Sequence, residues 1–222
     1  FFLLAFNLDA LAWLDTPVYA AVSGLHGPGM TRFFQVMTQA VHPAVLAVLS
    51  AVLIRLLHDR HSTAPILMNL GLSVLLNLGL KSLFARPRPA DVVRMVEATG
   101  YSFPSGHAMA AMTFYGFAIY LVCKSALPRR ARRAVCALLG ALIALVCLSR
   151  VYLGAHYASD VLGGLMASGA QLVVFTSFVP TYFRDARTPA PGGRATGRSL
   201  PSRLSPALRA PSPAPCRAPP PG

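Results

Sequence analysis

The chain has 222 residues, of which 55% are hydrophobic and only 12% are charged. That charged share is about half that of a typical soluble domain, while 20 Lys and Arg stand against 7 Asp and Glu for a formal net charge of +13. Such a composition excludes an ordinary soluble enzyme, and its apolar content also excludes a disordered chain. It predicts a membrane protein.

Long segments without Asp, Glu, Lys or Arg follow one another along the chain. A membrane-spanning helix needs roughly 20 mostly apolar residues, and five segments reach or approach that length. We therefore predict an all-α fold, a polytopic membrane helical bundle with a six-span core whose first span is truncated. Residues 1–6 would be the last turns of that first span. The other spans are predicted at residues 36–57, 62–84, 104–123, 134–154 and 157–180.

Two segments lie outside this core. Residues 7–32 are interrupted by turn formers, including Pro17 and Gly24, and are expected to form an outer segment at the membrane interface. From residue 184 the composition shifts to Pro, Arg, Ser and Ala, which cannot form a packed core. We predict a transmembrane domain at 1–183 and a disordered, Pro/Arg-rich cytoplasmic tail at 184–222.

The basic residues predict the orientation. Lys124 and four arginines between 129 and 133 fill one short link, and further arginines lie in the tail. By the positive-inside rule these segments are cytoplasmic. Because topology accounts for the positive charge, no nucleic-acid partner is predicted. The remaining ionisable residues near the spans then gather on the outer side, where charged groups at membrane depth indicate function.

The first such group is the segment from Lys81 to Pro89. Pro87 and Pro89 disfavour helix at the residues before them, so Lys81 is expected in the last turn of a span and Arg88 just beyond it. Two cations close together at the end of one span can bind a phosphate group. The alternative is a basic flank that anchors the helix by snorkelling. Arg86 could help to bind a second phosphate, but the pattern gives it no required role.

The second group is Pro104-Ser105-Gly106-His107 at the start of a span. Ser105 is a favourable N-cap, Gly106 lets a ligand approach the backbone, and free N–H groups at a helix N-terminus bind anions. His107, one turn in, is placed to give a proton to a leaving oxygen. A plain helix cap with an interfacial histidine is the alternative.

The third group runs from Arg150 to Asp160. His156 and Asp160 are four residues apart, so on a helix they share a face, and the carboxylate can orient the imidazole as a nucleophile. A structural salt bridge or a metal site are the alternatives, although no third ligand of the right kind is near in sequence.

Together these three groups, in this order and spacing, resemble the signature of the type-2 phosphatidic acid phosphatase superfamily. The resemblance implies a metal-independent integral membrane phosphatase without cofactors, of the bacterial inner (plasma) membrane, with its site facing the periplasm or cell exterior. It implies that His156 attacks phosphorus, Asp160 orients it and His107 protonates the leaving group. The phosphoryl oxygens would be held by Lys81, Arg88, Ser105, Gly106 and Arg150.

The expected partner is a lipid phosphate in the membrane. Undecaprenyl diphosphate, phosphatidate, phosphatidylglycerol phosphate and diacylglycerol pyrophosphate all fit, and the sequence does not choose among them. A lipid phosphotransferase and a non-catalytic anion- or lipid-binding membrane protein are the alternatives. The superfamily also resembles the vanadium haloperoxidases, but those are soluble and this chain is not.

Overall fold

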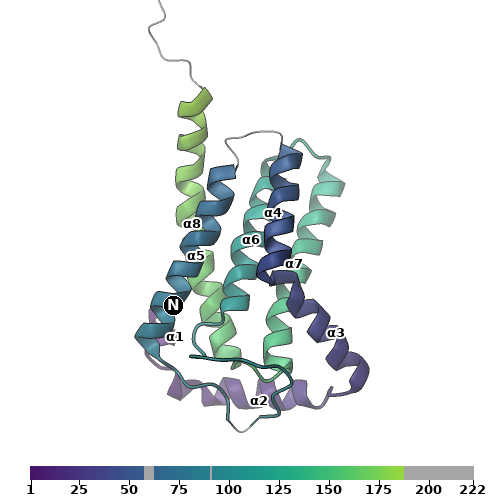
Figure 1. Ribbon diagram of the computed structural model, residues 1–222, viewed down its shortest axis with the longest axis vertical. Helices are drawn as coiled ribbons and strands as arrows, with labels where there is room; N and C mark the ends of the chain where they lie inside the picture. The colour runs from purple at the N-terminus through teal and green to yellow at the C-terminus, as the bar shows by residue number, and fades with distance from the viewer. Residues whose placement is uncertain (58–62, 91, 188–222) are drawn as a thin grey trace, which may run out of the picture. The chain divides into compact units, whose positions relative to one another are not determined.

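The computed structural model describes residues 1–57, 63–90 and 92–187 (Figure 1). Every regular element in these ranges is a helix, as predicted. Most of the predicted tail, residues 188–222, lies outside the described residues. The helix that precedes it continues to Arg187, four residues beyond the predicted domain boundary.

Four helices are long and apolar enough to cross a membrane, and all four were predicted. Helix α5 (Thr63–Phe84) and α6 (Gly106–Lys124) match the predicted bounds within about two residues. Helix α7 (Arg129–Tyr152) begins five residues earlier than expected, so its cluster of arginines forms its first turns. Helix α8 (Ala158–Arg187) completes the set. The chain is therefore an integral membrane protein.

The predicted span at 36–57 corresponds to a bent pair of helices. The structure has α3 (Pro28–Thr38), a short 3₁₀ turn η2 (Gln39–Val41) and α4 (Pro43–Leu57), with a bend of 54° between the two arms. Pro43 explains the break, because proline lacks an N–H and keeps the residue before it out of the helical region. That residue, His42, is accordingly extended, with φ −60° and ψ 138°. Counting this pair as one span gives five spans, and the six-span core is not confirmed.

The outer segment contains more helix than expected. After α1 (Phe2–Ala5) and η1 (Asp9–Leu11), helix α2 (Ala12–Ser23) continues through Pro17, where a break was predicted. Figure 1 shows α2 lying across one end of the bundle, at the opposite end from the α6–α7 connection. Trp13 on α2 is 71% exposed, which suits an interfacial aromatic anchor.

Helix α6 lies at the centre of the bundle. It packs on α5, α7 and α8, and its buried face includes Ala108, Ala111 and Phe114. Gly164 of α8 lets the two helices approach closely, because a Cβ at this position would lie 2.8 Å from the Ser105 carbonyl oxygen and 3.1 Å from the Ala108 Cβ. Small residues at such crossings are typical of membrane helices.

Gly164→Ala is therefore expected to destabilise the protein in detergent. The added Cβ forces α8 away from the start of α6, and overpacking of this kind costs about 1–3 kcal/mol. Gly140→Ala is the matched control, because a Cβ there meets no atom within 4 Å and the gain in helix propensity, about 1 kcal/mol, is the same at both positions. Thermal unfolding of the two variants checks this; a midpoint for Gly164→Ala at or above that of Gly140→Ala would contradict it.

Candidate active site

The three predicted groups converge at one end of the bundle. Lys81 lies in the last turn of α5, His107 in the first turn of α6 and Arg150 in the last turn of α7. His156 and Asp160 lie at the start of α8. His107 interacts electrostatically with Arg150 and His156, so residues from four helices share one site.

His156 and Asp160 form the predicted pair. The distance from His156 Nδ1 to Asp160 Oδ2 is 3.5 Å, and both side chains are buried. The pair is made although α8 begins at Ala158, so His156 lies in the turn before the helix rather than on it. Asp160 Oδ2 also accepts hydrogen bonds from the Ser102 hydroxyl and from the Tyr157 N–H, the latter at 3.0 Å. The carboxylate is thus fixed toward Nδ1.

This environment keeps the His156 imidazole neutral. The pKa of His156 is lowered to about 4, chiefly by burial and also by the nearby Arg150 and Arg88, against the opposing effect of Asp160. With the Nδ1 proton held toward the carboxylate, the lone pair is on Nε2, which lies 3.3 Å from Arg88 Nη1. A neutral imidazole whose lone pair is on Nε2 is the form that attacks an electrophile, and in this structure Nε2 faces Arg88 Nη1.

The pH profile should report this low pKa. Since only the neutral imidazole attacks, kcat/KM falls as His156 becomes protonated. We expect the acid limb near pH 4, and not near the ordinary histidine value of about 6.5, once the ionisation of the substrate phosphate has been corrected for. Initial rates between pH 3.5 and 8 measure it, with the substrate titrated separately. A corrected limb at pH 6 or above would contradict the assignment.

Backbone carbonyls hold two of the predicted cations. Arg88 donates to the carbonyls of Thr99, Gly100 and Ala155 at 2.9, 3.0 and 2.7 Å, and Lys81 donates to that of Tyr101. Burial lowers the pKa of Arg88, but arginine remains protonated in proteins. The loop after α5 therefore presents fixed positive charge beside His156.

Two buried donors at the site have no partner. Arg150 Nη1 donates to Thr38 Oγ1 at 2.7 Å, but its Nε has no hydrogen-bond partner. Ser105 takes the N-cap position of α6, as predicted, yet its hydroxyl makes no cap bond and is also without a partner. These are two of four such buried side-chain atoms among the described residues. Because unpaired buried polar atoms are costly, their presence here favours a bound anion.

Gly106 lets the start of α6 pack closely against α5. A Cβ at Gly106 would lie 3.1 Å from Asn77 Oδ1, and Asn77 in turn donates to the Pro104 carbonyl at 3.3 Å. Helix α6 therefore begins against α5, and the role predicted for Gly106 in phosphate binding stays a prediction.

Sequence reasoning missed three residues of the site. Arg86 is not available for a second phosphate, because its guanidinium bridges Asp160 at 2.6 Å and Asp15 at 3.1 Å. Ser102 bonds Asp160, as described above. No local pattern connects residue 15 with residues 86 and 160; only the fold joins them. The one available signal was an acidic residue in a segment that is otherwise mostly apolar.

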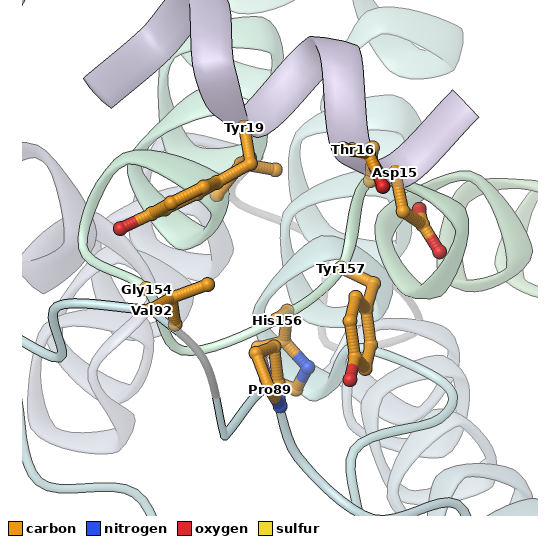
Figure 2. A pocket seen from close by; sticks show the side chains of 10 residues that line it. Asp15, Thr16, Tyr19, Pro89, Val92, Gly154, His156 and Tyr157 are labelled. Atoms are coloured by element: carbon orange, nitrogen blue, oxygen red, sulfur yellow. The ribbon is translucent and has the colours of Figure 1, made fainter. Parts of the chain in front are cut away.

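Two hollows adjoin the site. One cavity of about 200 Å³ lies beside His156, with Asp15, Thr16 and Tyr19 of α2 on one side and Pro89 on the other (Figure 2). The second is a mostly apolar groove of about 690 Å³ lined by α4, α5 and α6, which reaches Gly106 and His107 at one end. In the described part of the chain, no three His, Cys, Asp or Glu side chains converge as metal ligands.

Fold and site together define an integral membrane helical protein with arginine side chains beside a buried histidine–carboxylate pair. A family model, that of the PAP2 superfamily, matches residues 62–184, more than half of the chain. The chain belongs to the PAP2 superfamily, as the spacing of the three groups predicted.

Individual relatives agree with this family. The chain is 41% identical to phosphatidylglycerophosphatase B of Bacillus subtilis over 100 residues, which are 44% of this chain and 48% of that protein, so the match spans about half its length. It is 26% identical to the lipid A 4′-phosphatase of Bacteroides thetaiotaomicron over 204 residues, 83% of this chain and 86% of that one.

Solved structures show the same fold. The crystal structure of a transmembrane PAP2-type phosphatidylglycerolphosphate phosphatase from Bacillus subtilis superposes with a TM-score of 0.73 at 28% identity, covering 81% of this chain and 92% of that one. The structure of Aquifex aeolicus LpxE superposes with a TM-score of 0.61 at 23% identity, covering 74% and 95%.

Proposed function

We propose that this protein is a lipid phosphatase that hydrolyses a phosphate monoester or diphosphate of a membrane lipid through a phosphohistidine, without a metal ion. One observation carries the proposal. The neutral His156 imidazole borders a cavity and interacts electrostatically with Arg150, while the buried Arg150 Nε and the buried Ser105 Oγ at the start of α6 have no hydrogen-bond partner. A phosphoryl group would supply an electrophile for the His156 imidazole. Its oxygens would supply hydrogen-bond acceptors for Arg150 Nε and Ser105 Oγ.

In the first half-reaction, His156 Nε2 forms the N–P bond while the bond from phosphorus to the lipid oxygen breaks. His107 gives its proton to that oxygen, and the lipid alcohol or lipid phosphate leaves. Asp160 stabilises the positive charge that develops on the His156 ring. Arg88, Lys81 and Arg150 stabilise the charge on the phosphoryl oxygens.

In the second half-reaction, water attacks the phosphorus from the side that the leaving group vacated. His107, now neutral, accepts a proton from this water. The N–P bond breaks, inorganic phosphate leaves and His156 is neutral again. Each group thus returns to its starting protonation state, and no external cofactor is consumed.

The groove supports a lipid as the substrate. It connects His107, the proposed acid at the leaving oxygen, with apolar side chains of α4 and α5 such as Leu46, Leu67 and Val74. A leaving group held at His107 therefore continues into a surface that suits an acyl or prenyl chain. The groove does not distinguish among the candidate lipids, although the relatives named after phosphatidylglycerophosphate and lipid A favour phosphate monoesters.

The test is phosphate release by the detergent-purified protein in EDTA, with phosphatidylglycerol phosphate, phosphatidate and undecaprenyl diphosphate. We expect turnover of at least one of them. Ala110→Phe, one helical turn from His107 in the groove, should lower kcat/KM for long-chain lipids by about 10-fold or more and spare a short-chain analogue. Ala141→Phe on the exposed face of α7 is the matched control.

The outcomes separate the alternatives. No release from any lipid by the folded protein would overturn the hydrolase proposal, and release that depends on an added lipid acceptor would indicate phosphotransfer. Activity that EDTA abolishes and a divalent metal restores would overturn metal independence.

The proposal includes a topology. In it α1 is the end of the first of six spans, residues 1–183 form the catalytic domain and residues 184–222 form a cytoplasmic tail. The exposed Arg129 and Arg130 of α7 lie at the opposite end of that helix from Arg150, which supports a site on the outer face. Cysteine labelling at Glu97 in intact cells tests this orientation.

A further inference from the structure

Asp15 is a buried acid on the outer helix α2. Its carboxylate is 6% exposed and accepts three hydrogen bonds, from the Ser159 N–H at 2.8 Å, the Ser159 hydroxyl at 2.7 Å and Arg86 Nη2 at 3.1 Å. A carboxylate is buried in this way only when its charge and its oxygens are satisfied. Asp15 therefore binds the first turn of α8 and Arg86 together.

Arg86 carries the connection onward. Its Nη1 donates to Asp160 Oδ1 at 2.6 Å and to the Ser159 hydroxyl at 2.8 Å, and its guanidinium carbon lies 4.1 Å from the centre of the Tyr157 ring. Tyr157, Thr16 and Asp15 border the same cavity in Figure 2. Planar stacking and two carboxylates fix the guanidinium in one orientation.

The two oxygens of Asp160 then have different tasks. Oδ1 is held by Arg86, while Oδ2 accepts from Ser102 and Tyr157 and faces His156 Nδ1. If the carboxylate rotated, Oδ2 would leave the imidazole. The continuous series Asp15–Arg86–Asp160–His156 thus runs from the outer helix to the atom that attacks phosphorus.

We propose that Asp15 and Arg86 are positioning residues for the reaction: the Asp15 carboxylate fixes the Arg86 guanidinium, which in turn holds Asp160 in the orientation that His156 needs. The inference rests on the proposed function, because it assigns His156 and Asp160 the roles given above. In this proposal both Asp15 and Arg86 act through Asp160 and not by a contact with the phosphoryl group.

Charge balance explains why Asp15 matters as well as Arg86. With Asp15 present, the cation between two carboxylates is compensated on both sides. Without it, the whole positive charge of Arg86 acts on Asp160 and weakens the support that Asp160 gives to a developing imidazolium. Asp15 therefore affects kcat more than substrate binding.

The experiment compares Asp15→Asn with Glu97→Gln, the same loss of a carboxylate at an exposed position of the outer loop. Supporting partners of this kind contribute about 10–100-fold in activity. We expect kcat for Asp15→Asn to fall by that factor with KM within about threefold of wild type, and Glu97→Gln to be unchanged. Arg86→Lys keeps the charge but cannot bridge two carboxylates, so its kcat should fall by a similar factor. This variant tests the inference if Asp15→Asn does not fold.

A pH profile separates positioning from loosened packing. The charged and titratable groups around His156 are Asp160, Arg88, Arg150 and His107, with Arg86 behind Asp160. Removing the cation in Arg86→Gln should move the acid limb of kcat/KM to higher pH, whereas Asp15→Asn should not move it upward. A merely structural defect would produce no such difference.

Two results would overturn the inference. The first is wild-type kcat in the folded Asp15→Asn and Arg86→Lys variants. The second is a loss of kcat in the double variant Asp15→Asn/Arg86→Gln that equals the combined losses of the two single variants, because the effects of residues in one series should be non-additive. His156→Ala, assayed in parallel, keeps the two proposals apart. If His156→Ala is inactive while Asp15→Asn is normal, only the positioning inference fails; if His156→Ala is active, the proposed function fails.

Discussion

Replacing His156 with alanine is expected to lower lipid phosphate release by at least about 10⁴-fold, because loss of a nucleophile removes the covalent route altogether. The side chain is buried, its Nδ1 is held by Asp160 at 3.5 Å, and no other histidine has a carboxylate at this distance among the described residues. Initial rates with the best lipid substrate of the panel measure the loss. His107→Ala should retain more activity, since general acid–base groups contribute about 10²–10⁴-fold.

A second readout identifies the intermediate directly. Rapid acid-free quenching with a ³²P-labelled lipid should leave label on the wild-type protein that is acid-labile and alkali-stable, as expected for a phosphoramidate. The label should be absent from His156→Ala. His26→Ala is the matched control, because His26 is another outer histidine that contacts the Tyr152 carbonyl at 3.2 Å and not the pocket. Label that persists in His156→Ala would refute the phosphohistidine.

The sequence predicted best what depends on local pattern. The membrane helices followed from charge-free length, and the end of α5 and the start of α6 followed from Pro87 and Pro89 and from Ser105 at the N-cap. The His156–Asp160 pair followed from a spacing of four residues, although His156 precedes the helix. Each of these features is encoded within a few residues of the group that it places.

The sequence did not predict what depends on long-range packing. Pro43 was visible, but an apolar segment with one proline is compatible with a kinked span or with two helices, and the 54° bend is set by what α3 and α4 pack against. The sequence pattern gave Arg86 no required role beside Arg88. Only the fold brings Asp15, 71 residues away, to its guanidinium.

Arg150→Gln is the second large effect that we expect, a fall in kcat/KM of about 10³–10⁵-fold, comparable to the loss of an arginine that stabilises a phosphoryl transition state. Arg150 is 4% exposed, one terminal nitrogen is anchored by Thr38, and its Nε is without a partner. In the proposed mechanism, a guanidinium held in this way offers its Nε to a phosphoryl oxygen without rearrangement. Arg32→Gln, at an exposed position of α3, is the matched control and should be neutral.

Arg150→Lys distinguishes charge from geometry. A lysine keeps the positive charge, so KM for an anionic substrate should change little. A lysine cannot donate to Thr38 and to two phosphoryl oxygens at the same time, so kcat should remain at least about 10-fold below wild type. If kcat were restored by lysine, charge alone would be sufficient and the anchoring by Thr38 would have no catalytic role. If Arg150→Gln stayed within 10-fold of wild type, Arg150 would not be a phosphoryl ligand, and its unpaired Nε would need another explanation.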